Sequence, residues 1–226
     1  MRKIQRLAYI GAMAAAALTL AACGGTAAPA SSPAASAPAA APMTAAPAAA
    51  DTGVTTNADV FGPACSQLPQ GDAPGSLNAM GPQPVATAAS TNPLLSTLVT
   101  AVKAVPGLPD TLNNTQGITV FAPYNGAFDA VQKQIGAPAF QGLLKDTNTL
   151  GGLLSYHVVG QRYDAKSLVA AGQTTELAGG TLTIGGTAEA PTITDGQGNT
   201  AKVLCGNIPT SNATVFVIDR VLMPKG

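Results

Sequence analysis

The chain has 226 residues, which is enough for one ordinary domain and additional segments. It is 46% hydrophobic but only 10% charged, and it contains no Trp. Its formal net charge is zero, yet three of its eleven basic residues lie within the first six positions. Without the first 22 residues, eight basic residues face eleven acidic ones, so the rest of the chain lacks the basic surface of a nucleic-acid-binding protein. We therefore expect no nucleic acid among its partners.

Residues 1–22 have the pattern of a secretory signal peptide, because a basic start precedes an apolar run that ends at Leu20. The run is shorter than the roughly 20 residues that a membrane-spanning helix needs. It leads into Leu-Ala-Ala-Cys, which resembles the lipobox of bacterial lipoproteins, in which the Cys is lipidated after cleavage. We expect lipidation at Cys23 and an anchor on the outer face of the cell membrane. An ordinary signal peptide that leaves a Cys is the alternative.

Residues 23–57 combine this lipidated Cys with a low-complexity segment dominated by Ala and Pro. Such a segment favours extended, solvated chain, and at about 3.1 Å per residue its roughly thirty residues reach on the order of 100 Å. The segment is therefore predicted to be a stalk. Its Ser and Thr residues suit O-linked sugars or serve only solubility, and cleavage within it would release protein to the exterior.

Residues 58–226 are predicted to form one folded domain. Helical spacing of apolar residues follows Asn92-Pro93, Asn125 and a cap at Asp146 or Thr147, and a shorter helix follows Asp164. Alternating and β-branched segments then dominate the second half of the domain. The expected strands are 118–121, 155–159, 181–184, 191–194, 200–204, 214–218 and 220–223. Helices that precede a β-rich half indicate an α+β fold.

Three ordered stretches resemble the fingerprints of the fasciclin domain: TVFAPYNGAF at 119–128, SYHVV at 155–159 and ATVFVIDRVLMP at 213–224. The resemblance covers roughly residues 84–224. The chain as a whole resembles the immunogenic fasciclin-domain surface lipoproteins of mycobacteria. It implies a β-wedge of two sheets with helices packed along it. It also implies a membrane-anchored surface protein that mediates adhesion by binding a host-cell receptor or an extracellular matrix protein. A structural envelope protein that binds cell-wall glycan is the alternative function.

Cys65 and Cys205 are the two cysteines that remain if Cys23 carries lipid. In an exported protein two such cysteines are expected to pair, which would fasten the N-terminal segment to the last part of the sheet. Two free, buried thiols are the alternative.

Tyr156 and His157 match the Tyr–His pair that is implicated in cell adhesion by animal fasciclin domains, so the resemblance implies a partner-binding role for them. The alternative is a partly buried histidine that is hydrogen-bonded inside the domain. A single His makes a multi-His metal site impossible, and we expect no metal and no cofactor. Asp195-Gly196 is interpreted as a hairpin turn and not as a calcium loop, because the later bidentate Glu is missing.

An enzyme is not expected. The chain has no G-x-S-x-G motif, and Ser155 lies only two positions from His157, which is poor geometry for attack on an external substrate. Thr119, Asn125 and Asp219 are polar residues within the fingerprints, and we expect them to satisfy buried backbone groups, with Asn125 as a helix N-cap. Tyr124 stands where fasciclin domains usually carry Thr, and either a contact surface or a cover for the helix start would explain it.

Overall fold

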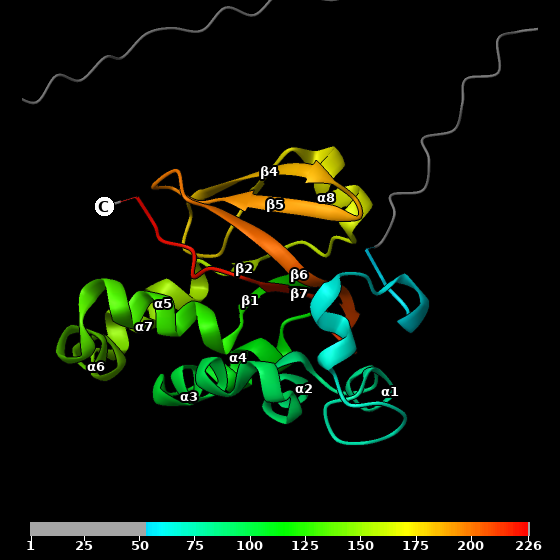
Figure 1. Ribbon diagram of the computed structural model, residues 1–226, viewed down its shortest axis with the longest axis horizontal. Helices are drawn as coiled ribbons and strands as arrows, with labels where there is room; N and C mark the ends of the chain where they lie inside the picture. The colour runs from blue at the N-terminus through cyan, green and yellow to red at the C-terminus, as the bar shows by residue number, and fades with distance from the viewer. Residues whose placement is uncertain (1–52, 226) are drawn as a thin grey trace, which may run out of the picture. The chain divides into compact units, whose positions relative to one another are not determined.

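The computed structural model describes residues 53–225 (Figure 1). The expected signal peptide, the lipidation site Cys23 and most of the expected stalk lie outside the described residues. The first described residue, Gly53, already contacts the sheet five residues before the expected boundary, since the hydroxyl of Thr214 donates a hydrogen bond of 2.7 Å to the Gly53 carbonyl oxygen. Two short 3-10 helices follow, η1 (Asn57–Asp59) and η2 (Pro63–Gln67).

The first half of the domain is helical, as expected. Asn92 caps the helix that it precedes, because its side chain accepts a hydrogen bond of 3.0 Å from the Leu94 amide. An additional helix forms at Leu108–Asn114, with Pro109 in its first turn, a position that suits a residue without an amide hydrogen. The elements here are α1 (Leu77–Met80), α2 (Val85–Thr91), η3 (Pro93–Leu95), α3 (Ser96–Ala104) and α4 (Leu108–Asn114).

The central fingerprint forms β1 (Ile118–Pro123) and then α5 (Asn125–Ile135), so the predicted change from strand to helix is confirmed. α6 (Ala137–Lys145) was not predicted, while α7 (Thr147–Ser155) is capped by Asp146 as expected. The prediction of a strand at 155–159 was too long. Ser155 ends α7, the next two residues form a turn, and only Val158–Val159 pair as β2. Asp164 caps α8 (Ala165–Ala171), again as expected.

The remaining strands are β3 (Gln173–Thr175), β4 (Thr181–Thr187), β5 (Ala190–Thr194), β6 (Thr200–Pro209) and β7 (Ala213–Ile218). The order across the sheet is β2-β1-β7-β6-β5-β4-β3, and only β1 and β7 run parallel. Residues 220–223, an expected strand, are not part of the sheet. The chain leaves the sheet after Ile218, and side chains from other elements hold this segment instead.

The ten-residue strand β6 joins the two sheets of the wedge (Figure 1). Its first residues pair with β5, and from Val203 it pairs with β7 through shifts in register. Such irregularities bend a strand, which lets one strand belong to two sheets. A single bridge between Val159 and Glu176 links the two outer strands' ends, so the sheet nearly closes on itself. The predicted α+β wedge with helices packed along it is therefore confirmed.

The core has two parts. One lies between the helices and the sheet, and the other lies inside the curved sheet beneath α8. β1 and β7 are buried along their whole length, because helices cover one face of this parallel pair and the rest of the sheet covers the other. Among the described helices none alone has the length and apolar composition of a membrane span; α2 and the following helix pass that test only together, bent by 99°.

Candidate functional site

The turn between α7 and β2 carries Tyr156 and His157, whose side chains are only 2% and 3% exposed. Leu150, Leu153 and Leu154 bury one face of α7, and the two valines of β2 are buried against the sheet, so the short turn between them is drawn into the core. Burial therefore removes this pair as a directly exposed contact surface. The alternative interpretation of His157, a hydrogen-bonded histidine inside the domain, describes the observed geometry.

Both ring nitrogens of His157 are hydrogen-bonded to backbone groups. Nδ1 lies 2.8 Å from the Leu153 carbonyl oxygen, and Nε2 accepts a hydrogen bond of 2.9 Å from the Leu222 amide. A carbonyl oxygen only accepts and an amide only donates, so the proton must be on Nδ1 and the ring is neutral. Burial lowers the pKa of His157 from 6.5 to about 4, against the opposing effects of the Leu153 bond and the negative charge of Asp195.

The hydroxyl of Tyr156 accepts a hydrogen bond of 2.8 Å from the Gly196 amide in the turn between β5 and β6. Burial raises the pKa of this phenol, so Tyr156 keeps its proton at neutral pH. Tyr156 belongs to the core inside the curved sheet, whereas His157 reaches the helices. The turn thus connects two separate hollows, one on each side.

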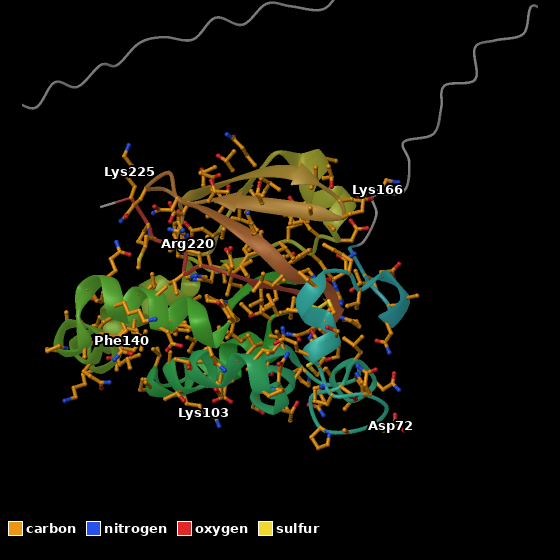
Figure 2. All side chains as sticks on the ribbon, in the orientation of Figure 1. Asp72, Lys103, Phe140, Lys166, Arg220 and Lys225 are labelled. Carbon is orange, nitrogen blue, oxygen red and sulfur yellow. A yellow bond between two sulfur atoms is a disulfide. The ribbon has the colours of Figure 1, made fainter. Side chains whose placement is uncertain are left out.

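The apolar hollow lies between α2, α3 and α4, with Val120 of β1, His157 and Val158 beneath it. Its volume is about 60 Å³, and its lining is almost entirely apolar. Ala89 of α2 and Val99 of α3 are half-buried at its wall. Lys103, which also borders it, lies on the outer side of α3 (Figure 2). A hollow of this size and chemistry suits one apolar side chain of a partner and not a charged ligand.

The second hollow lies on the other side, where the turns β3–β4 and β5–β6 meet the C-terminal segment, and its volume is about 460 Å³. Most of its lining surface is apolar, but several hydrogen-bonding groups also border it, and we call it the polar hollow for that reason. Tyr156, Glu176, Gly180, Gly196 and Lys225 are among its lining residues. Glu176 is buried, and its carboxylate accepts hydrogen bonds from the amides of Ala178 and Gly180.

Two fingerprint residues make the kind of contact that was expected of them. The hydroxyl of Thr119 donates to the Gln161 carbonyl oxygen and accepts from the Tyr163 amide, both at 2.8 Å, and so ties β1 to the chain after β2. Asp219 accepts a hydrogen bond of 2.8 Å from the amide of Lys202. Thr119 therefore joins the first fingerprint to the chain just after the second, and Asp219 joins the third fingerprint to β6 through an exposed bond.

The prediction that Asn125 is the N-cap of α5 was wrong. Tyr124 occupies that position and makes no capping bond through its side chain. The Asn125 side chain instead bonds to the backbone of another segment. It accepts from the Thr97 amide at 3.0 Å and donates to the Pro93 carbonyl oxygen at 3.0 Å. It therefore clamps α5 to the beginning of α3. The Tyr124 ring covers Gly126, where any Cβ would collide with it, so Tyr124 shields the helix start.

The disulfide between Cys65 and Cys205 is present, so the predicted pairing is confirmed. Cys205 lies on β6 and is fully buried, and Cys65 lies on η2 and is half-buried. Beside it, Phe61 and Gly206 form a backbone bridge with hydrogen bonds of 3.3 and 2.8 Å. The N-terminal segment is thus attached to β6 in two ways.

The residues weighed for catalysis and metal binding do not come together. Ser155 ends a helix, and both nitrogens of the neighbouring His157 are occupied by backbone groups. Asp195 closes its hairpin turn by accepting from the amides of Gln197 and Asn199, and its other oxygen accepts from the Met223 amide. Within residues 53–225 no three His, Cys, Asp or Glu side chains are grouped so that they could hold a metal ion.

Two important polar residues were missed from the sequence. Asn212 is buried and joins α2, α4 and the start of β7, accepting from the Val85 amide and donating to the carbonyl oxygens of Leu112 and Thr115. Arg162 donates to the carbonyl oxygens of Thr210 and Ala213. The place of Asn212 directly before the third fingerprint was the one available signal.

Sheet, covering helices and cross-link together define a disulfide-linked α+β domain. The model of the fasciclin domain matches residues 93–224. The cell surface glycolipoprotein MPB83 of Mycobacterium bovis is 41% identical over 175 residues, which are 74% of this chain and 73% of that protein. The immunogenic protein MPT70 of Mycobacterium tuberculosis is 37% identical over 177 residues, 74% of this chain and 83% of that protein.

Among solved structures, a FAS1 domain pair from the insect cell adhesion molecule Fasciclin I aligns with a TM-score of 0.54 and 19% identity. That alignment covers 62% of this chain and 51% of the domain pair, and at this identity it shows a shared fold. The chain belongs to the fasciclin family. Its named mycobacterial relatives support a cell-surface location for it.

Proposed function

We propose that this protein is a lipid-anchored surface protein whose fasciclin domain binds a protein of a host cell or of the extracellular matrix, and so mediates adhesion. The observation that carries the proposal is the apolar hollow between α2, α3 and α4, which opens at the surface and lies at the end of the Tyr–His turn. The names of the relatives, a cell surface glycolipoprotein and a cell adhesion molecule, agree with this function.

Filling the apolar hollow is expected to weaken adhesion. The substitution Ala89→Phe places a ring at its wall, whereas Ala130→Phe places the same ring on the exposed face of α5. Binding of the full-length protein to cultured cells and to immobilised matrix proteins should fall at least about tenfold for the first variant and stay unchanged for the second. Equal binding by both variants, or binding of the parent to cell-wall polymer alone, would overturn the proposal.

Substitution of Tyr156 and His157 themselves would be a poor test of adhesion, because both side chains are buried and their loss would destabilise the domain. A loss of cell binding in that double variant would not distinguish a lost contact from a lost fold. Residues at the wall of the hollow, which are half-buried, separate the two explanations.

The membrane anchor depends on Cys23, and its chemistry gives a direct measurement. In cells fed radioactive palmitate, the parent protein is expected to carry label and to sediment with membranes, because two or more acyl chains anchor a protein stably. The variant Cys23→Ala should carry no label and should appear in the soluble fraction. Label that persists in this variant would show that lipid is attached at another residue, and this would overturn the proposed anchor at Cys23.

A further inference from the structure

The polar hollow is built from parts of the chain that are far apart in sequence. Tyr156 comes from the turn after α7, Glu176 and Gly180 from the turn between β3 and β4, Gly196 from the next hairpin, and Lys225 from the C-terminal segment. The sheet brings these turns to one end of the domain. The hollow's volume of about 460 Å³ falls in the range of sites that hold small ligands.

The hydroxyl of Tyr156 can donate a hydrogen bond into this hollow. Its oxygen accepts from the Gly196 amide, but its proton has no acceptor among residues 53–225 within hydrogen-bonding distance. The side chain is only 2% exposed, and a buried tyrosine hydroxyl usually has a hydrogen-bond partner. The Gly196 amide is one such partner, and the O–H proton is left for another. A ligand that offers an oxygen here would complete the hydrogen bonding of Tyr156.

Acceptors and a second donor lie beside this phenol. The two oxygens of Glu176 each accept from one backbone amide, and a carboxylate has about four lone-pair sites, so it can accept further bonds. The second donor is the hydroxyl of Thr181, which is exposed at the wall. Lys225 is exposed at the rim, and its side chain points away from the domain (Figure 2). The hollow thus offers both donors and acceptors to one ligand.

Glycines keep the space beside Tyr156 open. A Cβ atom at Gly180 would collide with an oxygen of Glu176 and lie 3.1 Å from the Cε2 atom of Tyr156. One at Gly196 would lie 2.7 Å from the Lys225 backbone nitrogen and 3.1 Å from the Tyr156 hydroxyl oxygen. Side chains at these two positions would therefore crowd the phenol and fill the hollow next to it. Glycine at these two positions leaves the space next to the Tyr156 hydroxyl open.

We propose that the polar hollow binds one sugar ring of a glycan. A sugar hydroxyl donates and accepts at once, so a single ring can accept from Tyr156 and donate to Glu176 while its apolar face packs on Pro224. An anionic ligand would face the negative charges of Glu176 and Asp195, and an apolar ligand would leave the polar groups without partners. This site is separate from the apolar hollow, and it does not depend on the adhesion proposed above.

The test measures binding of soluble oligosaccharides to full-length protein in detergent micelles by calorimetry. One set is prepared from the cell wall of the producing organism and a second set from animal glycoproteins, so the source of the sugar is distinguished by which set binds. We expect one set to bind to the parent. Tyr156→Phe, which removes only the hydroxyl, should weaken that binding about tenfold.

A second pair of variants does not disturb the core. Thr181→Trp fills the hollow, and Thr183→Trp places the same side chain on the same exposed face of β4 but outside the hollow. Binding should be lost in the first and kept in the second, and this comparison decides the matter if Tyr156→Phe fails to fold. Failure of both sets to bind, or equal binding by the two Trp variants, would refute the site and leave the adhesion proposal untouched.

Discussion

Replacing both Cys65 and Cys205 by Ser is expected to lower the free energy of unfolding by up to about 5 kcal/mol. The cross-link closes a loop across 140 residues, and in the chain-entropy model it removes a large number of conformations from the unfolded state. The Phe61–Gly206 bridge remains in the variant, so the segment before α1 should stay in place while the domain becomes less stable. Urea unfolding at neutral pH, followed by circular dichroism, measures the difference.

Reduction of the parent protein with dithiothreitol provides the matched control for this result. The reduced parent and the double Ser variant should unfold at similar urea concentrations, both well below the oxidised parent. A single variant at Cys65 should fall in the same range, since it also breaks the loop. If the double variant were as stable as the oxidised parent, the loop-closure explanation would be wrong.

Replacing His157 by Ala is expected to lower the free energy of unfolding by about 4 kcal/mol. The substitution leaves the Leu153 carbonyl oxygen and the Leu222 amide without their buried partner, at roughly 1–3 kcal/mol each, and opens a cavity. It also removes one of the two bonds that hold the C-terminal segment, while the bond from the Met223 amide to Asp195 remains. A variant as stable as the parent in urea would show that these bonds contribute little.

The same histidine predicts how the parent responds to acid. Its pKa is about 4 when folded and near 6.5 when unfolded, so between these pH values the unfolded chain binds a proton that the folded protein does not. Stability should therefore be fully present above pH 6.5 and should fall by about 3 kcal/mol as the pH drops to 4. His157 is the chain's single histidine, so His157→Gln should lack this part of the pH dependence.

Nuclear magnetic resonance gives a direct reading of that pKa. The one imidazole signal of the folded protein should stay unchanged from pH 8 to pH 5, while the same signal in concentrated urea should titrate near 6.5. A folded-state midpoint near 6.5 would contradict the neutral Nδ1–H ring. The unfolded sample serves as the internal control, because it contains the same histidine without its two backbone partners.

Local patterns were enough to place four of the eight α-helices among residues 53–225, namely α3, α5, α7 and α8. The spacing of apolar residues predicts α5 and α8, and Asp146 indicates the start of α7 because it suits an N-cap. α6 was missed because Pro138 and Gly142 interrupt its pattern, although a Pro in the first turn is compatible with a helix. The prediction of a strand at 220–223 was wrong. The backbone amides of Leu222 and Met223 donate to the side chains of His157 and Asp195 and do not pair with a neighbouring strand.

The amino-acid sequence by itself determined the family, the α+β class and the identity of the paired cysteines, because these depend on local motifs, on periodicity and on a count of three cysteines. Only the tertiary structure decided which side chains a partner could reach. From the sequence, Tyr156 and His157 were predicted to bind a partner together. In the structure both are buried, and they lie beside different hollows. Whether a side chain is buried, and which of its hydrogen-bonding groups have partners, depends on which distant turns the folded sheet places side by side.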